Sequence, residues 1–193
     1  MPFRTSIILF VIFMLSGTGS YFAVQNGWYP IALVNFDIIT KKSVEKDSAA
    51  AFRYFQNALL TSGSDPGQLE RPESKKEIRR AVLDKLIADS LIYQELQSKF
   101  PREFQGIAEK NINQFIQDND NVEQGAKLLY GLEWPDFKER VLLPQAYREI
   151  LEGRMFLNNE NFSDWLVQKR GLARVIVFAP GLKWDNSEVK LRD

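Results

Sequence analysis

The sequence predicts a mainly α-helical domain that is closed by a small β-sheet and preceded by an N-terminal transmembrane helix. Three observations predict this fold class: an uncharged run opens the chain, amphipathic helical patterns fill its middle, and one strand-like segment lies on each side of these helices. The predicted organisation is an N-terminal transmembrane anchor or signal segment (residues 1–28), a helical domain (29–182) and a C-terminal tail (183–193).

The N-terminal segment has no charged residue from position 5 to position 36, between Arg4 and Asp37. About 20 apolar residues suffice to span the bilayer as a helix, and a positive charge at its start favours a cytoplasmic N-terminus. A cleaved signal peptide is the alternative, because Ile7 to Leu15 form a compact apolar stretch before SGTGS. We therefore expect a single-pass protein of the cell membrane with an extracytoplasmic C-terminal domain, or a cleaved, secreted form.

The composition argues against several classes of function. Lys and Arg together number 25, as do Asp and Glu, and the charges are interspersed, so no nucleic-acid partner is expected. The chain has no Cys and no His, which removes thiol nucleophiles, thiolate zinc sites and His-based catalysis. We expect no catalytic residue, no cofactor and no metal site.

Two segments are predicted to form the sheet. The stretch from Ile31 to Asn35 in YPIALVNFDIITKK reads as a buried strand, and its continuation through Asn35 and Asp37 predicts a small hairpin. The stretch LARVIVFAP (172–180) is an unbroken run of β-formers that Pro180 ends. Because a strand needs a hydrogen-bonding partner, we expect residues 31–39 and 172–179 to pair as a β clasp.

The helices between these segments are predicted from caps and apolar spacing. Thr40 is the expected N-cap of the first helix, and Ser74 with Glu77 resembles a capping box for the second, whose wide apolar face suits the centre of a bundle. Pro144 lies inside a later helix and predicts a kink there. The expected helices start at about Thr40, Ser74, Pro101, Val122, Pro135 and Asn161 or Ser163.

The segment ALVNFDIITKKSVEKD resembles the opening of SurA-like periplasmic chaperones and of their relatives, the membrane-anchored parvulin-type foldases. That family's short strand reads roughly Val-Asn-Gly-x-x-Ile-Thr; Val34, Asn35, Ile39 and Thr40 match it, whereas Phe36 replaces the Gly and predicts a wider hairpin. RRAVLDKLIADSLIYQEL, FKERVLLPQAYREIL and FSDWLVQKRGLARVIVF resemble later parts of the same N-terminal chaperone domain. The likeness covers about residues 30 to 180.

This resemblance implies the SurA-like chaperone module without the parvulin prolyl-isomerase domain. The segment between the Pro144 helix and NFSDWL is too short for such a domain, and the parvulin site uses paired His residues, which this chain lacks. The implied protein is a membrane-anchored holdase, not an enzyme, whose partners are unfolded or nascent exported polypeptides. The alternative is a structural or assembly subunit that docks on one specific membrane partner.

Aromatic side chains are the candidates for peptide binding: Tyr54, Phe55, Trp134, Phe137 and Tyr147. Aromatic residues at helical spacing are usually core residues, and this reading stays open, above all for Phe55 and Phe137. Tyr54 lies off the main stripe of its helix and Trp134 lies at a helix start, so both are better candidates for a surface groove. Carboxylate pairs such as Glu45 and Asp47 are expected on solvated helix faces.

Overall fold

The structure is a computed structural model that describes residues 24–192 of the chain. These residues are mainly helical, as predicted, and they form two small sheets, of which one was predicted. In chain order the elements are β1 (Pro30–Val34), β2 (Asp37–Thr40), α2 (Lys41–Thr61), the 3-10 turn η1 (Pro66–Glu70), α3 (Pro72–Lys99), α4 (Phe104–Asp118), α5 (Val122–Tyr130), α6 (Trp134–Phe137), the π-helical turn η2 (Lys138–Leu142), α7 (Leu143–Leu157), α8 (Phe162–Leu172), β3 (Val175–Val177), β4 (Leu182–Asp185) and β5 (Glu188–Leu191).

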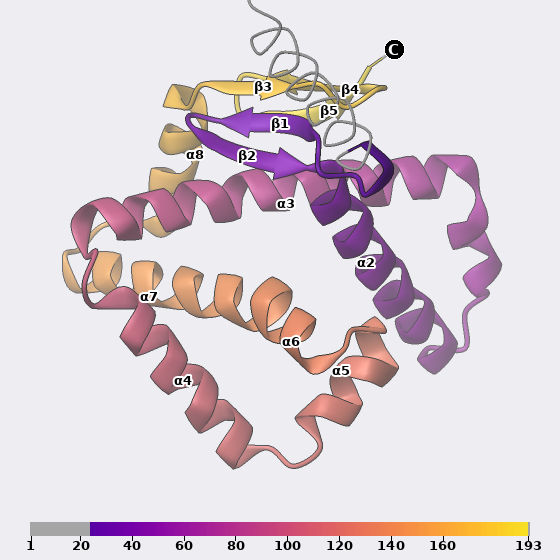
Figure 1. Cartoon of the computed structure of the whole chain (residues 1–193), viewed down its shortest axis with the longest axis horizontal. Helices are drawn as coiled ribbons and strands as arrows, with labels where there is room; N and C mark the ends of the chain where they lie inside the picture. Colours follow the sequence, from indigo (N-terminus) through magenta and orange to yellow (C-terminus); the bar gives the residue numbers. More distant parts are fainter. Residues whose placement is uncertain (1–23, 193) are drawn as a thin grey trace, which may run out of the picture.

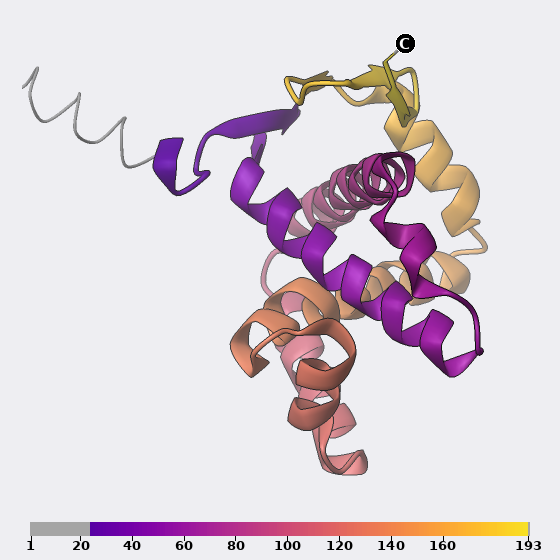
Figure 2. The same ribbon diagram turned by 90° about the vertical axis from the view of Figure 1, so that its right-hand side faces the viewer.

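Helix α3 is the centre of the arrangement. The two sheets lie on one side of it, and α2, α7, α4 and α5 lie on the other (Figures 1 and 2). Leu83 and Ile87 of α3 are fully buried against the sheets, whereas Ile92 and Leu96 are buried against the side formed by α4, α7 and α8. The wide apolar face predicted for this helix therefore serves two cores at once.

The predicted β clasp is confirmed. Strand β1 is the middle strand of a sheet of order β2-β1-β3, and both of its pairings are antiparallel. Ala32, Leu33 and Val34 lie opposite Val177, Ile176 and Val175, respectively. The two paired segments thus lie side by side, although most of the domain's sequence lies between them.

The hairpin between β1 and β2 is tighter than Phe36 led us to expect. Val34 pairs with Asp37, so only Asn35 and Phe36 form the turn. Asn35 takes the left-handed conformation, with φ of 56°, which Asn tolerates better than most residues. The expectation of a wider hairpin was wrong because Asn35 alone takes the left-handed conformation in this turn, so position 36 does not require Gly and the exposed Phe36 side chain fits there.

The helix boundaries follow the predicted caps in part. Thr40 is the N-cap of α2, and its side chain accepts a hydrogen bond from the Ser43 N–H at 3.2 Å. The capping box predicted at Ser74 is wrong: α3 begins at Pro72, and Ser74 instead donates to the Gln68 carbonyl. Proline suits this first helical position because its missing N–H would have no partner inside the helix.

A kink was expected at Pro144, and the structure has a π-helical turn just before this proline. Helices α6 and α7 are joined by η2, which ends two residues before Pro144. A proline inside a helix cannot donate to the preceding turn and clashes with the carbonyl four residues earlier. The wider π turn, in which the Leu143 N–H donates to the Lys138 carbonyl, accommodates that clash.

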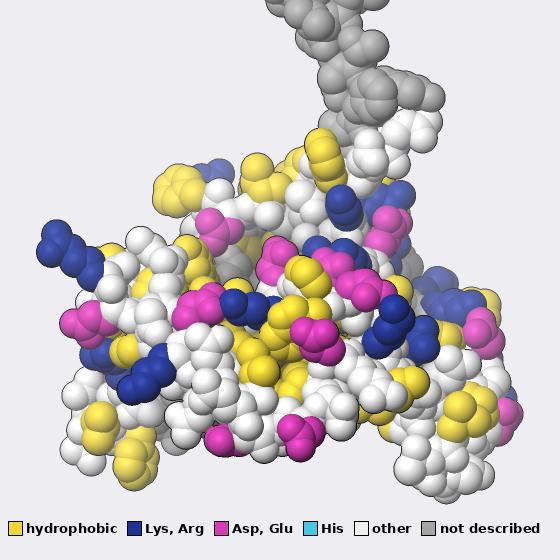
Figure 3. Space-filling model, turned by 60° about the horizontal axis from the view of Figure 1, so that its bottom comes forward, with side chains coloured by type: hydrophobic (Ala, Val, Ile, Leu, Met, Phe, Trp, Pro, Cys, Tyr) yellow, Lys and Arg dark blue, Asp and Glu magenta, His cyan; other side chains and the backbone are white. Residues whose placement is uncertain are grey.

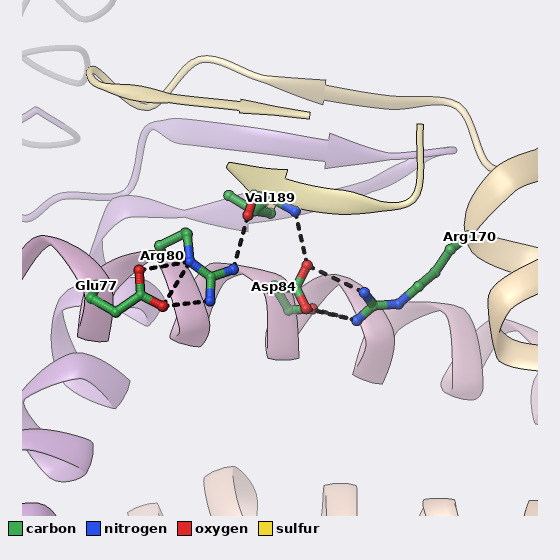
Figure 4. A network of polar contacts seen from close by, with 5 residues as sticks. All are labelled: Glu77, Arg80, Asp84, Arg170 and Val189. Atoms are coloured by element: carbon green, nitrogen blue, oxygen red, sulfur yellow. Dashed lines mark hydrogen bonds and ion pairs between the residues drawn. The ribbon is translucent and has the colours of Figure 1, made fainter. Parts of the chain in front are cut away.

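The segment expected as a C-terminal tail is part of the fold. Residues 182–191 form a hairpin of β4 and β5, in which Trp184 lies opposite Val189. The Val189 side chain is fully buried, and its backbone is bound by α3: its N–H donates to Asp84 at 2.9 Å and its carbonyl accepts from Arg80 at 2.9 Å (Figure 4). Arg170 of α8 donates to the same Asp84 carboxylate at 2.9 Å, which joins three elements.

Between residues 24 and 192, no helix combines the length and the apolar character that a bilayer crossing requires. The predicted transmembrane helix falls almost entirely on residues 1–23, which lie outside the described residues.

Candidate functional site

A cavity of about 370 Å³ opens between α2, α3, the end of α5, and the η2–α7 segment. Pockets that bind small molecules or side chains are commonly of this size or larger. The face of the molecule in Figure 3 has hydrophobic side chains in a hollowed centre and acidic and basic side chains around them. The cavity is lined by Asp47, Ala50, Ala51, Tyr54, Phe55, Val82, Lys85, Asp89, Tyr130, Leu132, Arg140, Val141, Pro144, Gln145 and Arg148.

Three aromatic rings form one wall of the cavity. Tyr54 and Phe55 follow each other on α2, with ring centroids 5.9 Å apart, and Tyr54 stacks on Tyr130 of α5 at 5.1 Å. Tyr54 is 41% exposed and Phe55 is 47% exposed. Burial raises the pKa of the Tyr130 hydroxyl, and the neighbouring Tyr54 adds to the shift. This wall therefore presents large apolar surfaces that are only partly covered by the protein itself.

Tyr130 is held in place by the docking of α5 on α2. Arg53 and Asn57 of α2 both donate to the Leu128 carbonyl near the end of α5, at 3.3 and 2.9 Å. The helix stops at Gly131, whose φ of +69° lies in the left-handed region that glycine adopts most easily. A side chain at this position would also collide with Arg53, whose Cδ lies 2.7 Å from the place of a Cβ atom.

The opposite end of the cavity is charged. Asp47 of α2 and Arg140 of η2 form an ion pair at 2.7 Å, and their side chains are only 10% and 15% exposed. Burial raises the pKa of the Asp47 carboxyl, and the hydrogen bond and charge of Arg140 oppose that shift. Lys85 and Asp89 of α3 form a second pair at 2.5 Å. Arg148, which also lines the cavity, lies instead over the Phe162 ring at 5.3 Å, so the lining combines two ion pairs with one further basic side chain.

Asp47 also corrects an expectation. The Glu45 and Asp47 pair was expected on a solvated helix face, but only Glu45 lies there, in an exposed pair with Lys41. Asp47 points toward η2 because positions 44, 47, 50 and 51 share the inner side of α2. The sequence spacing alone did not indicate that an acidic residue would lie on this inner side.

Two of the five predicted peptide-binding residues line the cavity. Tyr54 and Phe55 do so, and both are exposed, so the core reading of Phe55 is wrong. Phe137 is buried, with its ring 5.3 Å from Tyr130, so it supports the aromatic wall from behind. Trp134 packs against Phe137 at 6.2 Å and is half-buried; it does not line the cavity.

Tyr147 belongs to a different part of the core. Its ring contacts Phe104 at 5.3 Å and Tyr93 at 5.7 Å, between α3, α4 and α7. The structure therefore does not bring it to the same site as Tyr54.

Sequence reasoning missed Tyr130 and the Asp47–Arg140 pair as parts of the site. Tyr130 could have been suspected, since it is an aromatic residue in the last turn of a short helix before a glycine. The ion pair joins residues 93 positions apart, and no local pattern signals such a pairing.

The walls of the site supply apolar and aromatic surface, and its charged end holds the ion pairs Asp47–Arg140 and Lys85–Asp89 together with Arg148. Across the described residues, no group of three acidic side chains is arranged to hold a metal ion.

We compared the chain with family models, curated proteins and solved structures, and none of them matches it.

Proposed function

We propose that this protein is a membrane-anchored, extracytoplasmic chaperone of the holdase type, built on a SurA-like N-terminal domain without an isomerase domain. Its clients are unfolded or nascent exported polypeptides. The observation that carries the proposal is the aromatic-walled cavity, which is open in the single chain. Tyr54 and Phe55 are partly exposed there, although burying such rings against the protein would stabilise it.

The size and lining of the cavity support transient binding of apolar client side chains. A volume of about 370 Å³ admits one or two large side chains at a time. Each buried apolar side chain contributes about 1.5–3 kcal/mol, and ordering the client opposes this gain. Weak binding and fast exchange result, which suits a protein that holds many different chains.

The matched test compares Phe55→Ala with Phe115→Ala. The two phenylalanines are 47% and 44% exposed, but Phe115 lies on α4 and does not line the cavity. Purified residues 30 to 193 should slow the aggregation of a chemically unfolded client, measured by light scattering. Phe55→Ala should weaken this protection at least about threefold, because it removes a contact of about 1 kcal/mol or more, and Phe115→Ala should leave it unchanged.

Three outcomes would contradict the proposal. Equal protection by both variants, with unfolding curves that show both to be folded, would separate the cavity from any client binding. A domain that protects no client yet co-purifies with one membrane protein would favour the assembly-subunit alternative. Acceleration of X-Pro cis–trans exchange would contradict both readings, since that reaction has a barrier of about 20 kcal/mol and requires a catalytic site.

The proposed location has a separate test. Arg4 precedes the uncharged run, so the domain should lie outside the cytoplasm. A reporter that is active only after export, fused behind Asp193, should be active. Activity of a cytoplasm-only reporter at the same position would overturn the extracytoplasmic reading.

A further inference from the structure

The three-stranded sheet has an outer face whose apolar side chains are partly exposed. Leu33 lies opposite both Ile38 and Ile176, so these three residues form one row across the sheet. Their neighbours Val34 and Ile39 point the other way and are buried in the core with residues of α3. Ile38 is nevertheless 61% exposed and Ile176 is 40% exposed.

Exposed apolar residues extend this face at its edges. Phe36, in the turn between β1 and β2, is 98% exposed. Phe178 is 52% exposed and follows Ile176 by two positions, which places it on the same side of an extended chain. Val24 and Trp28, on the segment that enters β1, are 61% and 58% exposed. Exposed apolar side chains thus occur on the outer face of the sheet and near both ends of β1, and a cluster of exposed apolar residues marks an interaction site.

The face carries no exposed negative charge from its own strands. Asp37 is the one acidic residue among β1, β2 and β3. Its carboxylate accepts hydrogen bonds from Ser90 at 2.8 Å and from Gln94 at 2.7 Å, both on α3, so it points away from the apolar row. An anionic surface would therefore meet no repulsion from the strands.

Basic and aromatic side chains border the face where the chain enters it. Lys42 lies over the Trp28 ring at 5.4 Å, and Lys41 lies over the Tyr29 ring at 5.6 Å. Trp and Tyr are enriched at membrane–water interfaces, where one end of the ring is apolar and the other is wet. Lys42 beside Trp28 favours anionic lipid headgroups, whereas Lys41 is paired with Glu45 at 3.3 Å.

The sequence before the sheet brings a membrane close to this face. Residues 5–23 carry no charge, and Trp28 follows Val24 by four positions. Since a residue extends the chain by at most about 3.6 Å, Trp28 lies within about 15 Å of the point where an anchor ending at Val24 would leave the bilayer. The backbone there is tied to α2, because the Lys42 N–H donates to the Gly27 carbonyl at 2.8 Å.

We propose that the outer face of the three-stranded sheet, with Phe36, Ile38, Ile176 and Phe178, rests on the lipid surface in the headgroup region. The inference relies on the proposed function only for the membrane anchor. Helix α3 separates the sheet from the cavity: its Leu83 and Ile87 face the sheets, and its Val82, Lys85 and Asp89 line the cavity. A lipid-bound sheet therefore leaves the cavity open to clients.

The test uses the full chain, which has no cysteine of its own. Phe36→Cys and the control Phe115→Cys, at a less exposed position on α4, are each labelled with an environment-sensitive fluorophore and reconstituted into vesicles of phosphatidylcholine and phosphatidylglycerol. Lipids with a nitroxide near the headgroup quench labels at that depth. We expect at least about twofold stronger quenching at position 36, since an interfacial apolar face lies about 5–10 Å into the headgroup boundary. Ile38→Asp should reduce this quenching.

The remaining outcomes are distinguishable. The inference is overturned if the label at position 36 is as water-exposed and as weakly quenched as the label at position 115. If the chain nevertheless stays in the vesicles after a carbonate wash, the proposed membrane anchor still stands. A label that is shielded from water but not quenched shows a protein cover, either residues 1–23 or a second copy, and also overturns it. A chain that washes off the vesicles overturns both this inference and the proposed anchor.

Discussion

Replacing Val189 by Ala tests whether the C-terminal hairpin is an integral part of the domain. Val189 is fully buried beneath the hairpin, and the substitution removes two methyl groups from that contact. Each buried methylene-sized group contributes about 0.8 kcal/mol by transfer, and the cavity left behind adds to the loss. We therefore expect the free energy of unfolding to fall by about 1.5–3 kcal/mol. The backbone bonds of Val189 to Asp84 and Arg80 are unaffected, so the change measures the side chain alone.

The assay is urea unfolding of residues 30 to 193, followed by tryptophan fluorescence. Trp184 lies opposite Val189 in the hairpin and reports on it directly. Leu191→Ala is the control on the same strand, because Leu191 is 41% exposed; it should cost less than about 0.5 kcal/mol. Equal, small effects of both substitutions would mean that the hairpin is undocked and that residues 183–193 behave as the tail that the sequence suggested.

Two further predictions concern the sheet and the acid stability of α3. Ile39→Asp should cost several kcal/mol in urea unfolding, because it puts a charge into a dry core, whereas Ile38→Asp, on the exposed face of the same strand, should cost less than about 1 kcal/mol in the absence of lipid. Burial opposes the charge of Glu95, but its ion pairs with Lys169 at 2.6 Å and Lys99 at 2.9 Å outweigh burial and hold its pKa below the usual value. A depressed carboxyl pKa stabilises the fold above the unfolded pKa of about 4.3 and loses this effect as the pH falls through the folded pKa. Glu95→Gln should thus cost about 1 kcal/mol at pH 7, and this cost should shrink as the pH falls through the folded pKa; a cost that does not change with pH would refute the assignment.

The sequence was informative where a single local pattern decides the structure. The clasp was predictable because, behind the uncharged N-terminal segment, the runs Ile31 to Val34 and Val175 to Phe178 stand out as apolar β-forming stretches, and each needs a partner. Thr40 was recognisable as a cap because its side chain acts within three residues. The expected kink at Pro144 arose from the chemistry of one residue, although its form, a π turn, depends on the neighbours.

The C-terminal hairpin left a weaker signal that was not used. Leu182 and Trp184 alternate with polar residues, as do Val189 and Leu191, around a two-residue turn that begins at Asn186, with φ of 57°. Alternation of this kind is typical of a strand that is buried on one side. The high polarity of the segment concealed it.

The site itself could be predicted only in part. Tyr54 and Phe55 were identified as aromatic candidates, but which rings remain uncovered depends on where α5 and η2 pack. Tyr147 illustrates the difficulty, since the same helical spacing placed it in a core with Tyr93 and Phe104. Periodicity shows which side of a helix is apolar; it does not show whether a neighbouring helix covers that side.

The place of Asn35 in the clasp has a consequence for the order of folding. Its backbone N–H donates to the Arg174 carbonyl at 2.8 Å and its side chain accepts from the Arg174 N–H at 3.0 Å, across 139 positions of sequence. Closing a loop of that length costs about 4 kcal/mol of chain entropy, so this side of β1 pairs late. At a synthesis rate of about 5–20 residues per second, its hydrogen-bonding edge stays open for about 7–30 s. During that interval the edge of β1 that will pair with β3 has no partner. The other edge of β1 is covered by β2, which follows it within a few residues.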